Sequence, residues 1–120
     1  MKAALRAIHS PDVGDLPNWD PPPGPFVLLV QLFVGEAGGR GTESIDISVC
    51  NPAWINERAS TEHVVDLRHH IVVDQFDFPA LRAYLAKRVE AVEGSDWSEI
   101  AEKLGRLGHW EFEDYRPGES

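Results

Sequence analysis

The chain has 120 residues, of which 42% are hydrophobic and 26% charged, and this balance predicts one globular domain over residues 1–120. Its formal net charge of −9 disfavours nucleic acid as a ligand, because such affinity depends on Lys and Arg side chains that displace counterions. A single cysteine, Cys50, excludes an intramolecular disulfide, and no segment reaches the ~18 consecutive apolar residues of a membrane span. We therefore expect a soluble, cytoplasmic protein that does not bind membranes.

The first 25 residues predict a strand followed by a loop. Residues 2–9 are rich in apolar side chains, which favours a strand, although their alanine content leaves a helix open. Residues 10–25 contain six prolines, and because proline has no N–H to donate, we expect a loop over the surface. Trp19 lies in the middle of this loop, and we expect it to tether the loop to the core.

Two strands joined by a hairpin are predicted next. Residues 26–34 form an almost unbroken apolar run, typical of a central strand that is covered on both faces. Residues 42–50 alternate, which predicts a strand with one apolar face made by Ile45, Ile47 and Val49. The sequence GEAGGRG between them favours a hairpin. A phosphate-binding loop would end in Gly-Lys-Ser/Thr and open a helix, and this segment does neither.

The middle of the chain has a weaker pattern. Cys50, Asn51 and Pro52 predict a proline turn at the end of the strand. Residues 56–68 are polar without a clear period, and we expect a loop or a short helical turn there. Residues 69–76 predict another strand.

Two helices and a last strand follow. Asp77 is a suitable N-cap for a first helix that Gly94 ends, and Asp96 and Glu99 have the spacing of a capping box for a second. The buried stripes expected for these helices are Leu81, Leu85, Val89 and Val92 in the first, and Trp97, Ile100, Ala101 and Leu104 in the second. Residues 109–115 predict the last strand, with Trp110 and Phe112 on the core face and Glu111 and Glu113 on the other.

This order of elements predicts an α+β fold. We expect a mainly antiparallel sheet of about five strands, with the two C-terminal helices packed on one face and followed by the last strand.

The sequence contains no motif of a known active site. His70 and Asp74 would share a face of a strand, but two ligands do not make a metal site. Cys50 has no local signature of a nucleophile, and we expect a structural role for it. A small metal-dependent enzyme and a self-assembling interaction module nevertheless stay open as alternative functions at this point.

Six segments in a fixed order carry a family resemblance. They are HSPDV at 9–13, FVLLVQLFVGEAGG at 26–39, SIDISVCNPAWI at 44–55, HHIVVDQFDFPAL at 69–81, DWSEIAEKL at 96–104 and WEFEDY at 110–115. Together they resemble the immunity protein 8 family of bacterial polymorphic toxin systems. The resemblance implies a protein that binds and neutralises a toxin encoded next to it, with no catalytic residues and no cofactor. From the residues themselves we expect no metal site.

The acidic residues suggest where such a toxin binds. Residues 90–120 contain nine acidic and three basic side chains. We hypothesise that an acidic surface made of Glu111, Glu113, Asp114, Asp96 and Glu99 meets a basic toxin, such as a nuclease, because complementary charge speeds association. Alternatively, packing alone fixes the terminal motif, and the loops 10–25 and 56–68 are rival contact sites.

Overall fold

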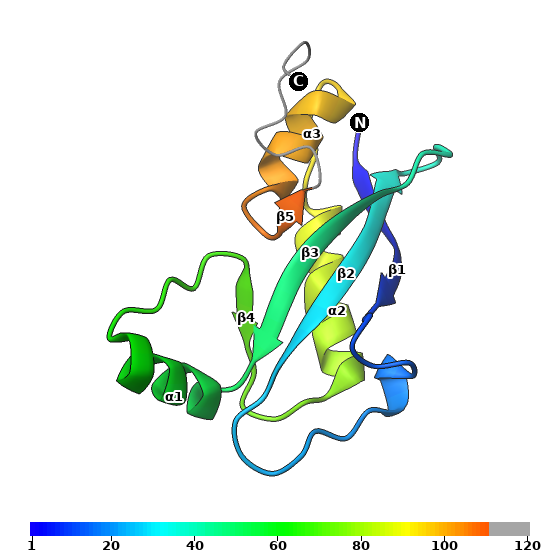
Figure 1. Ribbon diagram of the computed structural model, residues 1–120. Coiled ribbons are helices and arrows are strands. Elements are labelled where there is room, and N and C mark those ends of the chain that lie inside the picture. The colour runs from blue at the N-terminus through cyan, green and yellow to red at the C-terminus, as the bar shows by residue number, and fades with distance from the viewer. Residues whose placement is uncertain (111–120) are drawn as a thin grey trace, which may run out of the picture.

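The computed structural model describes residues 1–110 and has the α+β fold that the sequence predicts, an open and mainly antiparallel sheet with helices (Figure 1). The described elements are β1 (Ala3–His9), a 3-10 turn (Leu16–Asn18), β2 (Val27–Glu36), β3 (Glu43–Cys50), α1 (Pro52–Glu62), β4 (His70–Val72), α2 (Phe78–Glu90), α3 (Trp97–Leu104) and β5 (His109–Trp110). Residues 111–115 of the predicted last strand lie outside the described part of the chain.

Strands β1, β2 and β3 form an antiparallel meander. The predicted hairpin joins β2 to β3, and Gly38 in it has φ +80°, a conformation that favours glycine. Arg6 of β1 stabilises the hairpin by donating to the carbonyl oxygens of Glu36, Gly39 and Gly41 at 2.8–3.2 Å. The strand predicted for residues 2–9 and both strands of the hairpin are thus confirmed.

On its other edge β3 pairs with two short strands, β4 in parallel and β5 antiparallel. β4 contains three residues, so the strand predicted over 69–76 is too long. The reason lies in its partner: β3 ends at Cys50, after which Pro52 opens a helix, and the last bond along this edge runs from Val73 N to Cys50 O at 2.8 Å.

The core lies between one face of the sheet and helices α2 and α3. It contains alternate residues of β2 and β3, such as Leu32 and Ile45, and most of the predicted helix stripes, including Leu85 and Ile100. Two stripe residues, Val92 and Trp97, are only partly buried against it. The prediction that Gly94 ends the first helix is wrong, because α2 ends at Glu90 and Val92 lies beyond it. Figure 1 shows α2 crossing behind the sheet. The expectation that β2 is covered on both faces is wrong, because fully buried residues alternate with partly exposed ones such as Leu29 along most of the strand.

Helix α1 corrects the expectation of a loop or short turn over residues 56–68. It has 11 residues and none of them is buried, and Figure 1 shows that it projects from the end of the sheet. The Asn51 side chain caps it by accepting from Trp54 N at 3.0 Å, and it ends at His63 in the left-handed conformation (φ 67°). Because no face of α1 is buried, its sequence has no apolar period to reveal it.

The proline-rich loop is tethered as expected. Trp19 makes edge-to-face contacts with Phe26 and Phe76, at centroid distances of 5.6 and 4.9 Å. At the start of the loop, buried Ser10 donates to Leu29 O at 2.6 Å and so holds the loop against β2. In the described part of the chain, we find no helix with the length and apolar character of a membrane span.

Candidate functional site: a basic cleft between two helices

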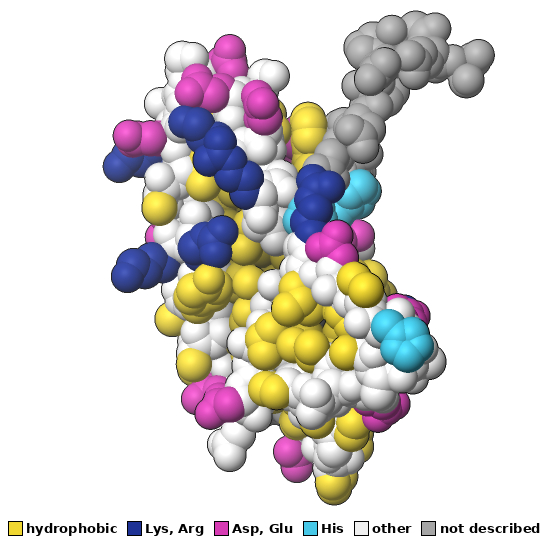
Figure 2. Space-filling view, turned by 90° about the vertical axis from the view of Figure 1, so that its left-hand side faces the viewer, with side chains coloured by type: hydrophobic (Ala, Val, Ile, Leu, Met, Phe, Trp, Pro, Cys, Tyr) yellow, Lys and Arg dark blue, Asp and Glu magenta, His cyan; other side chains and the backbone are white. Residues whose placement is uncertain are grey.

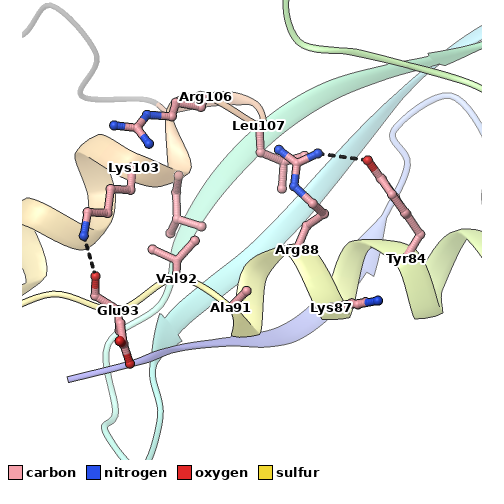
Figure 3. Close-up of a pocket in the computed structure, with 10 residues that line it drawn as sticks. Tyr84, Lys87, Arg88, Ala91, Val92, Glu93, Lys103, Arg106 and Leu107 are labelled. Carbon is pink, nitrogen blue, oxygen red and sulfur yellow. Dashed lines mark hydrogen bonds between the residues drawn. The ribbon is translucent and has the colours of Figure 1, made fainter.

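A cleft of about 630 Å³ opens where α2 and α3 both end (Figure 3). We call it the basic cleft, and its lining residues are Tyr84, Lys87, Arg88, Ala91, Val92, Glu93, Lys103, Leu104, Arg106 and Leu107. No motif in the sequence predicts it, because its two halves are separated along the chain and meet only through the packing of the helices.

Helix periodicity places the side chains of the cleft. Leu85 and Val89 turn into the core, so Tyr84, Lys87 and Arg88 lie on the exposed surface of α2 beside the cleft. On the opposite side, α3 ends at Leu104 with Gly105 as its C-cap, and the following turn buries Leu107 while Arg106 stays exposed. The result is an apolar floor with a charged rim.

The rim is basic although the chain is acidic. Four of the 11 Lys and Arg residues line the cleft, namely Lys87, Arg88, Lys103 and Arg106, against one acidic residue, Glu93. Figure 2 shows Lys and Arg side chains in the upper half of one face, most on the left and others nearer the middle, with Asp and Glu side chains above them and exposed hydrophobic side chains below. The cleft therefore presents positive charge within a protein whose net charge is −9.

The four cations differ in how they are held. Lys103 Nζ lies 3.1 Å from Glu99 Oε1 and donates to Glu93 O at 2.8 Å, and Arg88 Nη1 donates to Tyr84 Oη at 2.9 Å. Within residues 1–110, the side chains of Lys87 and Arg106 make no hydrogen bond or ion pair. Two charges at the rim are thus available to a ligand, and a third is held in position by a tyrosine.

Both helices direct their C-terminal ends toward the cleft. The C-terminal end of a helix carries partial negative charge, which Lys87, Arg88 and Lys103 in the last turns complement. No helix N-terminus contributes to the lining, so the cleft lacks the backbone N–H groups that usually hold a phosphate.

The acidic residues proposed from the sequence occupy other positions. Asp96 caps α3 by accepting from Glu99 N at 2.8 Å, as the capping box predicts. Glu99 accepts from the backbone N–H of Ser95 at 2.9 Å rather than from Asp96, and this bond, the Ser95 hydroxyl and Lys103 lower the pKa of Glu99 to about 2. Glu111, Glu113 and Asp114 lie outside the described residues.

His69, His70 and Cys50 have structural contacts. His69 Nε2 lies 2.7 Å from Gly105 O, and His70 stacks on Trp54 with a centroid distance of 5.6 Å. Within residues 1–110, no three His, Cys, Asp or Glu side chains are placed to hold a metal ion. Cys50 is fully buried, and burial raises the pKa of its thiol, which keeps it protonated and unreactive.

Comparison with known proteins gives one family. The model of the family described as immunity protein 8 matches residues 3–115, nearly the whole chain. Comparison with curated proteins and with solved structures finds no match. Because the family match spans the sheet, all three helices and the terminal segment that carried the resemblance, this chain belongs to the immunity protein 8 family.

Proposed function

We propose that the protein is an immunity protein that binds and neutralises a cognate toxin without catalysing a reaction. The observation that carries this proposal is the family match over residues 3–115. It favours inhibition by binding over a metal-dependent enzyme or a self-assembling module. The inhibitor acts in the cytoplasm of a bacterial cell that also encodes the toxin.

Neutralisation is tested with the toxin domain encoded beside the gene. Co-expression of the wild-type protein should restore growth to cells that make this toxin, and the purified proteins should form a complex of fixed stoichiometry. Growth that is not restored, or a protein that does not bind the toxin, would contradict the proposal. Loss of toxin activity at far less than one inhibitor per toxin would instead indicate an enzyme.

We also propose that the acidic surface of Asp96, Glu99, Glu111, Glu113 and Asp114 faces a basic toxin domain, for example a nuclease. The support is the excess of acidic residues in the last 31 positions of the chain, nine against three basic ones. Complementary charge raises association rates toward ~10⁸–10⁹ M⁻¹s⁻¹ at low salt, which suits an inhibitor that must act before damage occurs.

Charge reversal tests this surface. The double variant Glu111→Lys/Glu113→Lys should slow association with the toxin about tenfold at low salt and much less at high salt, because salt screens the attraction. The control is Glu36→Lys/Asp74→Lys, which makes the same change in net charge at two exposed positions outside the acidic surface and outside the rival segments 10–25 and 56–68. Equal association rates for both variants would exclude the acidic surface from the interface.

A further inference from the structure

We propose that the basic cleft receives an exposed segment of the toxin in which Asp or Glu side chains flank an apolar side chain. This inference rests on the proposed function and adds a second contact to the acidic surface. The cleft would bind negatively charged side chains, whereas the net charge of the chain favours a positively charged partner.

The first argument is the position of the charges. Lys87 and Arg106 are the two uncommitted cations, that is, the two cations of the rim whose side chains make no hydrogen bond or ion pair within residues 1–110. Lys87 lies on α2 and Arg106 follows α3, so they come from opposite sides of one cleft. A segment bound between them can offer a carboxylate to each. The guanidinium of Arg106 can form two parallel hydrogen bonds with one carboxylate, whereas Lys87 acts as a point charge.

The second argument is preorganisation. Arg88 Nη1 donates to Tyr84 Oη at 2.9 Å, and its guanidinium carbon lies 5.8 Å from the centre of the Tyr84 ring. This contact fixes a long side chain before any partner binds, which lowers the entropy lost on binding. Tyr84 itself stays 45% exposed and offers an aromatic surface at the mouth of the cleft.

The third argument is the apolar floor. Leu104 and Leu107 are buried and Val92 is half-buried, and Figure 3 shows Val92 and Leu107 between the charged side chains of the two walls. An apolar side chain that covers this floor would exclude water and strengthen the ion pairs at the rim. A ligand that carries charges but no apolar side chain would not cover this floor.

The same geometry argues against a phosphate or nucleic acid ligand. The helix ends that face the cleft are C-terminal, and their partial negative charge opposes a compact dianion. The net charge of −9 also repels a polyanion as it approaches. Carboxylates on a protein segment carry single charges, and they can be spaced to match cations on two walls.

The two surfaces would have separate effects on binding. The acidic surface mainly accelerates encounter with a basic toxin, whereas the cleft slows dissociation and selects among toxins that carry different segments. A toxin without the matching carboxylates would leave the cationic rim unpaired in the complex, at a cost in affinity.

The experiment compares two double variants with the same change in net charge. Lys87→Glu/Arg106→Glu reverses both uncommitted cations of the cleft, and Arg40→Glu/Arg82→Glu reverses two exposed arginines that do not line it. We expect the cleft variant to bind the cognate toxin domain about tenfold to a hundredfold more weakly, mainly through faster dissociation, and to lose protection in co-expression. The control variant should change affinity less than about threefold.

Further measurements separate a loss of binding from a loss of folding. Circular dichroism should show the same fold for both variants and the wild type. The midpoint of thermal unfolding should fall only slightly in the cleft variant, because Lys87 no longer complements the C-terminal end of α2. The milder Lys87→Gln/Arg106→Gln variant should be intermediate in affinity, which keeps the test valid if charge reversal disturbs folding. Reversal of the matching carboxylates on the toxin should restore binding to the Lys87→Glu/Arg106→Glu variant.

Three outcomes would overturn the proposal. If the cleft variant binds like the control while the wild type neutralises the toxin, the cleft is outside the interface and the proposed function stands. If the wild type does not bind the toxin, both proposals fall. If an oligonucleotide or inorganic phosphate binds the cleft and leaves toxin binding unchanged, the cleft is an anion site of another kind.

Discussion

Glu43 at the start of β3 connects two later elements of the chain through their tryptophans. Its carboxylate accepts from Trp97 Nε1 of α3 at 2.9 Å and from Trp110 Nε1 of β5. Both indoles are half-buried, so a lost acceptor would leave a poorly solvated donor. One residue thus links both α3 and β5 to the start of β3.

Replacement of Glu43 should therefore destabilise the fold in steps. Glu43→Gln keeps one acceptor oxygen and should lower the free energy of unfolding by about 1 kcal/mol, whereas Glu43→Ala removes both acceptors and should lower it by about 2–3 kcal/mol. Urea unfolding followed by tryptophan fluorescence gives these values. Glu102→Ala, an exposed carboxylate on α3, is the control and should change little. Equal stability of Glu43→Ala and the control would contradict the role of Glu43.

Glu99 makes stability depend on pH in a defined range. The hydrogen bonds from Ser95 and the charge of Lys103 lower its pKa from 4.5 to about 2 in the folded protein. Because the folded-state pKa is the lower one, the stabilisation is fully present above about pH 4.5 and is lost as pH falls toward 2. Glu99→Gln should thus melt below the wild type at neutral pH, and the gap should close across this range.

Thermal unfolding at several pH values tests the role of Glu99. Glu102→Gln removes an exposed carboxylate from the same helix and should follow the wild type at every pH. A constant difference in melting temperature between Glu99→Gln and the wild type from pH 5 to pH 2 would show that the ionised carboxylate is not the source of the stabilisation.

At the scale of elements, the sequence predicts those that bury one face. Strand β3 has alternating apolar residues, Ile45, Ile47 and Val49, and α2 has Leu81 and Leu85 at helical spacing. Both patterns arise because these residues pack in the common core, and both elements are found where expected. Helix α1 has no such contact, so only its caps could have indicated it, through Asn51 followed by Pro52. The basic cleft has no local signal for a related reason, since it depends on how α2 and α3 pack and not on a pattern within one segment.

Asn51 is the residue on which α1 depends. Its Oδ1 accepts from Trp54 N and from Phe26 N, both at 3.0 Å, and its Nδ2 donates to Gly24 O at 3.0 Å. Asn51→Ala should lower the free energy of unfolding by about 1–2 kcal/mol and speed amide exchange in α1, because the cap and the link to the preceding loop are lost together. Asn51→Asp keeps the acceptor and should lie between.

The comparison for Asn51 is Asn56→Ala, an exposed asparagine inside α1 without a capping role. Hydrogen exchange followed residue by residue separates a local effect on α1 from global loss of stability. Unchanged exchange in α1 of the Asn51→Ala variant would show that the helix does not need its cap.

For the whole molecule, one continuous core predicts one unfolding transition. One hydrophobic cluster contains residues of β1, β2, β3, α2 and α3. None of these elements can therefore unfold without exposing apolar side chains of the others to water. Thermal unfolding followed by tryptophan fluorescence and by far-UV circular dichroism should give the same midpoint. Two separate transitions would contradict the prediction of one domain over residues 1–120.

The distribution of charge also belongs to this scale. Composition shows that the protein is acidic as a whole. The net charge does not show that four of its cationic side chains line one cleft. A total charge cannot reveal that grouping, because it does not record which residues the fold brings together. The acidic surface is likewise a hypothesis about position that only binding measurements can test.

The placement of α1 outside the core has a consequence for how such a protein can diversify. Substitutions at exposed sites away from structural contacts usually alter stability by no more than about 0.5 kcal/mol, and positions such as Ala53 and Asn56 are of this kind. The outer surface of the helix can therefore acquire new side chains while the rest of the scaffold stays intact. For the same reason, it is a convenient place to attach a fluorophore or graft a foreign epitope.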